Sequence, residues 1–157
     1  MPFASSTSSG INFLDVTISD KPDSRTGSVA INQNHSIIAS SYNNFIEFHN
    51  SSSLELIMKF EFVREVYHIE FSPSGKHLAA SISANEAMID SLRIIDVQNL
   101  SLLSAKGKGN NRPGNLDYSP DGGKIIAPNM NNGAQIINSF TMGTIRELNG
   151  EHTSDVT

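Results

Sequence analysis

One turn sequence occurs twice in this chain and constrains its architecture. Ser72-Pro-Ser-Gly75 and Ser119-Pro-Asp-Gly122 each separate two apolar runs, and their prolines lie 47 residues apart. Proline presets φ for a tight turn, glycine accepts the positive φ that closes it, and Ser or Asp bonds to the nearby backbone. Both segments are therefore predicted hairpin turns, and their recurrence indicates a repeated supersecondary unit. The marker residues are Pro73, Gly75, Pro120, Asp121 and Gly122.

A second position repeats with nearly the same spacing. Each unit places a short carboxylate or amide after the apolar residues of its third predicted strand, at Asn50, Asp96 and Asn138, spaced by 46 and 42 residues. Residues 32–35 take the place of the turn in the first unit. The middle unit has an insertion of about five residues in the loop between its second and third strands, as repeat architectures tolerate.

These marks predict three units after an N-terminal segment. A small, polar tail at 1–10 is expected to be flexible, and 11–19 reads as an additional strand. The units span residues 28–62, 66–106 and 115–157. Their predicted strands are 28–31, 36–42, 45–49 and 54–62; 66–71, 77–82, 92–97 and 100–105; and 115–118, 124–127, 134–138 and 144–148.

No segment holds a 3.6-residue apolar period over the ~10 to 12 residues that a globular helix usually needs. Turn residues interrupt every apolar run. The predicted fold class is therefore all-β, with antiparallel four-stranded blades.

This repeat resembles that of the WD40 β-propellers, whose four-stranded blades run about 40 to 45 residues. The similarity covers residues 28–157 and is carried by Phe71–Ala80, Leu92–Asp96, Tyr118–Gly122 and Gly150–Val156. It implies blades arranged around a central channel, with loops that dock other proteins.

The sequence also departs from that family. It contains no tryptophan, and the Gly-His pair of the family occurs once, with Glu151 inserted before His152. In the family, His and a turn Asp brace the blade through Ser or Thr and Trp. We therefore expect apolar packing to hold these blades, with that hydrogen-bonded brace largely missing.

Three blades are fewer than the roughly four to eight of a closed propeller. An open array exposes blade faces that are built to be covered. Three arrangements are expected to cover them: two copies that pair into six blades, completion by another chain, or a longer propeller of which this sequence is a fragment.

Charge and composition restrict the partners. The chain of 157 residues fits one domain, and its net charge of -5 with scattered Lys and Arg offers no basic stripe, so nucleic-acid binding is not expected. With no cysteine, disulfides, cysteine-ligated zinc and a thiol nucleophile are excluded. The first residues do not resemble a signal peptide, and no window is apolar enough to span a membrane. Location in the cytoplasm or nucleus follows as the expectation.

Candidate chemistry is sparse. His68 and Glu70 lie two residues apart, which places them on one face of a strand, but no third metal ligand is in sequence reach, and we expect a solvated or interblade pair. No serine lies in a nucleophile elbow, so no catalytic residue, metal or cofactor is predicted. The one basic, glycine-rich run contains Lys106, Lys108 and Arg112 and is expected to be a flexible loop between two blades. Because such a run could hold a phosphate among its backbone N–H groups, it is also the candidate contact for an anionic partner.

Two function classes remain. The first is a non-catalytic scaffold that binds other proteins, favoured because no acid, base or metal set clusters in the sequence. The second is an enzyme or small-ligand binder of another propeller family, with its site at the central channel. Fold alone does not choose between them.

Overall fold

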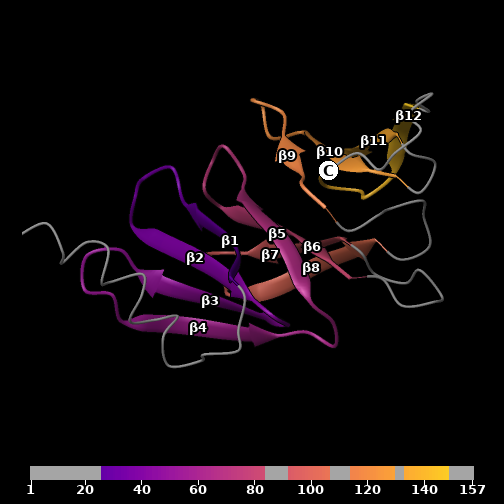
Figure 1. The fold of residues 1–157 in the computed structure, drawn as a ribbon. Helices are drawn as coiled ribbons and strands as arrows, with labels where there is room; N and C mark the ends of the chain where they lie inside the picture. Colours follow the sequence, from indigo (N-terminus) through magenta and orange to yellow (C-terminus); the bar gives the residue numbers. More distant parts are fainter. Residues whose placement is uncertain (1–25, 84–91, 107–113, 130–132, 149–157) are drawn as a thin grey trace, which may run out of the picture.

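The computed structural model describes residues 26–83, 92–106, 114–129 and 133–148 (Figure 1). Its twelve strands form three four-stranded sheets, all antiparallel. In every sheet each strand pairs with its neighbours in the chain, so each sheet is an up-and-down meander. The prediction of an all-β fold with three four-stranded blades is confirmed, and the blades form an open, partial propeller.

The strands are as follows. The first blade contains β1 (Thr26–Ile31), β2 (Ile37–Tyr42), β3 (Phe45–Asn50) and β4 (Leu56–Glu61). The second contains β5 (Val66–Phe71), β6 (His77–Ile82), β7 (Leu92–Asp96) and β8 (Ser101–Lys106). The third contains β9 (Asp117–Tyr118), β10 (Lys124–Pro128), β11 (Ala134–Asn138) and β12 (Thr144–Leu148).

The predicted bounds agree with the structure at both ends of β5, β6, β11 and β12. The largest difference is β4, which was expected over 54–62 and spans 56–61. β9 was expected to begin at Asn115 but pairs only Asp117 and Tyr118 with β10. The strand predicted at 11–19 and the tail at 1–10 lie outside the described residues.

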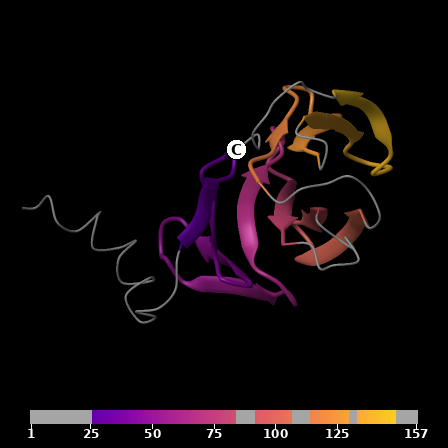
Figure 2. The ribbon, with the colours of Figure 1, turned by 45° about the vertical axis from the view of Figure 1, so that its right-hand side comes forward.

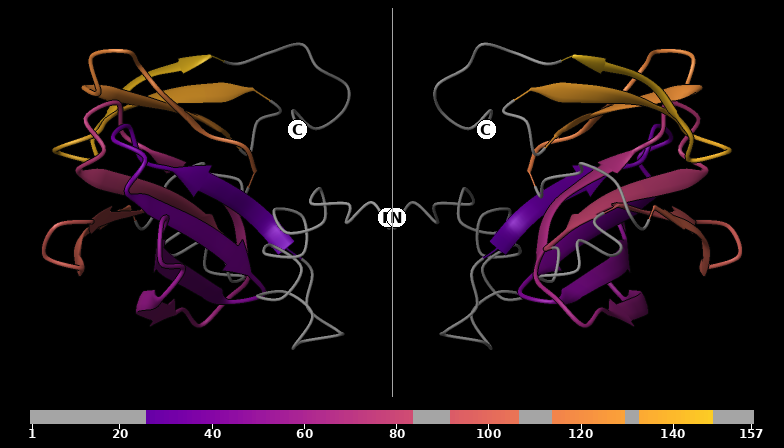
Figure 3. Two further views of the ribbon diagram at one scale, coloured as in Figure 1. Left: turned by 90° about the vertical axis from the view of Figure 1, so that its left-hand side faces the viewer. Right: turned by 90° about the vertical axis from the view of Figure 1, so that its right-hand side faces the viewer.

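The three blades fan out from their first strands (Figure 2). β1 lies against β5, and β5 lies against β9. The fourth strands lie on the outside, where nearly every residue of β4 and β12 is exposed. The first and third blades thus lie on opposite sides of the second (Figure 3).

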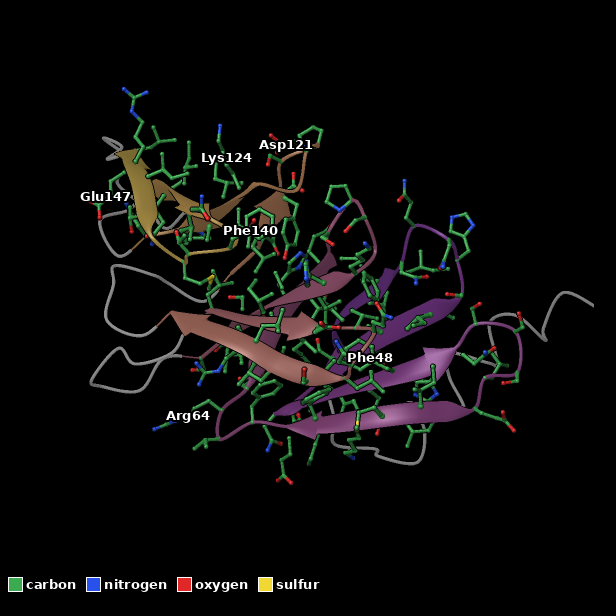
Figure 4. The ribbon with its side chains drawn as sticks, turned by 180° about the vertical axis from the view of Figure 1, so that it is seen from behind. Phe48, Arg64, Asp121, Lys124, Phe140 and Glu147 are labelled. Carbon is green, nitrogen blue, oxygen red and sulfur yellow. The ribbon has the colours of Figure 1, made fainter. Side chains whose placement is uncertain are left out.

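Apolar side chains fill the two spaces between the blades. Between the first and second blades, Ala39 and Phe48 pack with Ile69 and Leu78, and Phe48 points into this interior (Figure 4). A second cluster joins the second and third blades through Ala79, Leu92, Ile94, Leu116, Ile125 and Ile137. The expectation that apolar packing holds the blades together is confirmed.

The first turn of each blade has one geometry, although only two share the sequence. Gly75 and Gly122 have φ of 69° and 72°, and each N–H donates to the carbonyl oxygen of the serine three residues earlier, at 2.8 and 2.7 Å. In the first blade His35, with φ 57°, donates in the same way to Asn32 at 2.9 Å. The segment 32–35 is therefore the equivalent turn, with histidine in the position of glycine.

The third turn of each blade, between its third and fourth strands, is built on the residues predicted as register marks. The side-chain oxygen of Asn50 accepts hydrogen bonds from two backbone N–H groups, two and three residues on, at 2.9 Å each. Asp96 and Asn138 do the same at 2.8 to 3.0 Å. Four residues after each mark the backbone takes a positive φ, which the sequence pattern did not predict: Leu54, Leu100 and Met142.

Candidate functional site

The predicted site residues fall into turn marks and an interaction loop. The turn marks of the described chain lie at one end of the blades, because the first and third turns of an antiparallel meander share an end. Lys106 is the last residue of β8, and its side chain is not described. Lys108, Arg112 and His152 lie outside the described residues, so the basic loop stays a prediction.

A groove lies at the end of the blades that carries the turn marks. It has a volume of about 510 Å³ and lies between the first turn of the first blade and the first and third turns of the second. We call it the turn-face groove. Its lining residues are Asn32, Gln33, Asn34, Ser36, Ile37, Ser74, Gly75, Lys76, Val97 and Gln98.

The chemistry of the turn-face groove suits a peptide backbone. Six of its ten lining residues are exposed, so it is a surface groove and not an enclosed cavity. The side-chain amide of Asn32 is buried and hydrogen-bonds Ser36 and Ile37 within its own turn. Gln33 and Gln98 are exposed, and each carries a carbonyl acceptor and an NH₂ donor, as a peptide group requires. Lys76 adds one cation at the rim.

A second polar group lies where the first strands of the blades meet. It contains Ser28 of β1, His68 and Glu70 of β5, and Asp117 of β9, and we call it the inner-wall cluster. Ser28 Oγ lies 3.4 Å from His68 Nδ1 and also donates to the carbonyl oxygen of Ile69 at 3.4 Å. His68 Nε2 lies 3.9 Å from Glu70 Oε2, which confirms that these two side chains share a face.

Burial sets the protonation of the inner-wall cluster. It lowers the pKa of His68, against the opposing effects of a hydrogen bond to the Leu116 backbone and of the Asp117 carboxylate. Burial also raises the pKa of Glu70, and the negative charge of Asp117 raises it further. The imidazole is therefore mainly neutral at neutral pH and hydrogen-bonds both neighbouring blades.

The inner-wall cluster has a hydroxyl–imidazole contact but little else that catalysis needs. A nucleophile and its base usually lie about 2.6 to 3.2 Å apart, closer than Ser28 and His68. Among the described residues, no three His, Asp or Glu side chains are grouped so that they could hold a metal ion. The contacts present join the blades.

A third polar group was not predicted from the sequence. Glu47 of β3 is buried, accepts a hydrogen bond from Tyr42 Oη at 2.6 Å, and lies 3.2 Å from Lys59 Nζ and 3.5 Å from His49 Nε2. Lys59 Nζ also lies 3.9 Å from the centroid of the Phe45 ring. Burial raises the pKa of Glu47, but the hydrogen bonds from Tyr42 and Lys59 outweigh it, and the net pKa is lowered.

Part of this group could have been predicted from the sequence. The Asn43–Asn44 turn sets the register of β2 with β3, which places Tyr42 opposite Phe45 and close to Glu47. The pairing of Glu47 with Lys59 depends on the register between β3 and β4, which shifts between Phe48 and His49 of β3. No local sequence feature predicts that shift in register.

Comparison with known proteins supports the fold and not a family. No protein-family model matches the sequence, and no curated protein sequence is significantly similar to it.

In the described part of the chain, no helix is long and apolar enough to cross a membrane.

Solved structures of similar fold do exist. Hydrazine synthase from Kuenenia stuttgartiensis superposes with a TM-score of 0.66 at 13% identity, over 78% of this chain and 36% of that one. The structure of U3-55K superposes with a TM-score of 0.70 at 13% identity, over 82% of this chain and 40% of that one. The chain thus spans well under half the length of either structure. Both are β-propeller-like, so this chain has a β-propeller-like fold of three open blades.

Proposed function

We propose that this chain is a WD40-like, non-catalytic scaffold that binds other proteins, as a subunit or part of a larger propeller or assembly. The observation that carries the proposal is the turn-face groove, which is open, rich in amides and formed jointly by two blades. A groove of this kind offers paired donors and acceptors to an extended segment of a partner, with little enclosed apolar volume for a small molecule.

Other parts of the proposal come from the sequence. The partners are proteins and not nucleic acid, because the chain is acidic overall. The predicted basic loop with Lys106, Lys108 and Arg112 is a second candidate contact for an acidic segment of the partner. We propose a cytoplasmic or nuclear location, which imaging of a fluorescent fusion would test.

Affinity capture with groove variants tests the scaffold function. The double variant Gln33→Arg, Gln98→Arg fills the turn-face groove with two long cations. The control is Val63→Arg, in the loop between β4 and β5, where Val63 is 96% exposed and lies at the opposite end of the blades. Proteins retained from the extract of the source cells by the wild type and by Val63→Arg should be lost with the double variant. A chain that retains no protein but turns over a small substrate would overturn the proposal.

The alternative function is an enzyme or small-ligand binder with its site at the central channel. The contact between Ser28 and His68 on the inner strands is the observation that favours it. A fluorophosphonate probe, which labels activated serines, separates the two functions. Labelling of Ser28 that is lost in His68→Ala would favour the enzyme, whereas an unlabelled Ser28 favours the scaffold.

A further inference from the structure

The two interblade contacts inside this chain use equivalent positions. We call the face of a blade that packs on the following blade its leading face, and the face that packs on the preceding blade its trailing face. On leading faces, Ala39 pairs with Phe48 in the first blade and Ala79 pairs with Ile94 in the second, and all four are buried. The equivalent trailing-face residues are Ile69, Phe71 and Leu78 in the second blade and Leu116, Tyr118 and Ile125 in the third.

Each end of the fan leaves one half of this contact uncovered. On the trailing face of the first blade, Val29 and Ile31 occupy positions equivalent to Ile69 and Phe71 of the second blade. Val29 and Ile31 are each 52% exposed, whereas Ile69 and Phe71 are only 1% and 7% exposed. On the leading face of the third blade, Ile126 occupies the position equivalent to Ala79 of the second blade. Ile126 is 42% exposed, whereas Ala79 is fully buried, with 0% exposed. The two ends are therefore complementary halves of a contact that the chain already makes twice.

The surface beside Ile126 is hollowed. A depression of about 230 Å³ lies there, lined mainly by apolar groups of the third blade. Its lining residues are Asn115, Leu116, Asp117, Ile126, Ala127, Pro128 and Ala134. A trailing face that seats Val29 and Ile31 against this depression would remove both exposed apolar patches from water.

One polar contact recurs across the interblade boundaries. Ser28 of the first blade donates to the carbonyl oxygen of Ile69, and His68 of the second hydrogen-bonds the backbone of Leu116. Ser28 and His68 each lie four residues before the first residue of their blade's first turn, and Asn115 has this position in the third blade. Asn115 is therefore the equivalent donor of the third blade. The equivalent acceptor is the backbone carbonyl of Val29 in the first blade. Asn115 is exposed, so its amide is accessible to such a partner.

The charges of the two end faces are also complementary. The strand pairing places two cations, Lys124 and Arg146, and one carboxylate, Asp117, on the leading face of the third blade. The same pairing places two carboxylates, Glu47 and Glu61, and one cation, Lys59, on the trailing face of the first blade. One face is therefore positive by one charge and the other negative by one, which favours their pairing.

We propose that the two end faces bind each other between two copies of this chain, the third blade of each copy packing on the first blade of the other. A twofold axis satisfies both contacts at once and closes a ring of six blades, within the range of about four to eight seen for closed propellers. Asn115 of one copy donates to the backbone carbonyl of Val29 of the other. The proposal deepens the scaffold function, on which it rests, by naming the first partner as a second copy.

Sedimentation equilibrium on the full chain tests the ring. The expected species has twice the 17.0 kDa mass of one chain. Val29→Asp and Ile126→Asp, each of which places a carboxylate in both contacts of the ring, should raise the dimer dissociation constant by at least about tenfold. Val63→Asp, the control at an exposed position away from both end faces, should leave the dimer intact.

A mixture of the two variants gives the sharpest result. A dimer of one Val29→Asp copy with one Ile126→Asp copy contains one contact that is unchanged on both sides, so mixing should restore part of the dimer. Far-UV circular dichroism on each variant shows that the strands are retained.

Three results would overturn the ring: a wild-type monomer at all concentrations, masses that grow beyond two copies, or variants that fail to complement. A monomer that still captures proteins through the turn-face groove would leave the scaffold function standing. An intact dimer that captures none would overturn only the scaffold function.

Discussion

The Lys59 ammonium group lies 3.2 Å from the Glu47 carboxylate across β3 and β4, on the trailing face of the first blade. Tyr42 Oη donates to the same carboxylate, and both acidic oxygens lie in a largely buried environment. Removal of one member of such a group leaves the others desolvated without their charge partner. Two predictions follow from this geometry.

The substitution Glu47→Gln should lower the free energy of unfolding by about 1 to 3 kcal/mol, because the Lys59 and Tyr42 donors lose a charged acceptor. Urea denaturation followed by circular dichroism measures the change. Glu147→Gln, the same replacement on the exposed strand β12, is the control and should change stability by less than about 0.5 kcal/mol. Equal losses in the two variants would contradict the assignment of a buried charge group.

The contribution of Glu47 should also depend on pH. Its pKa in the folded chain lies below the ordinary value of 4.5, so the unfolded chain binds its proton first as the pH falls. The stabilisation is therefore fully present above about pH 5 and declines as the pH falls below 4.5 toward the folded pKa. Measured against pH, the stability difference between the wild type and Glu47→Gln should shrink in that acidic window. A difference that grows on acidification would mean that the folded pKa is raised.

The first turn of the first blade holds a residue that the other blades replace with glycine. His35 has φ 57°, a conformation that costs an L-residue roughly 1 to 2 kcal/mol. His35→Gly should therefore stabilise the chain by about 0.5 to 1 kcal/mol, after the entropy cost of glycine in the unfolded chain. Thermal unfolding at fixed pH measures the gain.

Gly122→Ala serves as the matched reverse substitution. An added Cβ would meet only Pro73 Cδ at 3.6 Å, so its cost comes mainly from φ 72°, and the variant should lose about 1 to 2 kcal/mol. Changes of the same sign in both variants would show that the two turns are not equivalent.

The third turn of each blade depends on a side-chain acceptor at the end of the third strand. Asn138→Ala removes the oxygen that accepts two N–H groups, from Phe140 and Thr141, and should cost about 0.5 to 2 kcal/mol, as for loss of a comparable helix cap. Asn50→Ala should cost a similar amount. Asn138→Asp, which keeps the acceptor, is the control, and chemical denaturation compares the three. No loss in either alanine variant would show that these residues mark the turns without stabilising them.

Much of each blade was predictable because the information is local. In the turn at 119–122, proline, glycine and a short polar side chain act within four residues of one another, so the sequence pattern carries the geometry. The equivalence of Asn50, Asp96 and Asn138 followed from spacing, and the structure places all three in the same turn. The positive φ of Leu54 was missed because Leu carries no signal for it.

The candidate sites were less accessible to prediction. The pairing of His68 with Glu70 followed from the alternation of a strand, but the approach of Ser28 depends on how β1 lies against β5, 40 residues along the chain. The turn-face groove likewise requires two blades to be placed side by side.

By itself, then, the sequence determined the blades: strand alternation, turn chemistry and the repeat follow from interactions between residues close in the chain. Only the tertiary structure decided which blade faces meet and which stay open. It also decided where Glu47 and Lys59 pair, because interblade contact and β4 register depend on packing between strands whose faces look alike in sequence. An exposed Val29 and a buried Ile69 are similar apolar residues in equivalent strands, and only the presence of a preceding blade distinguishes them.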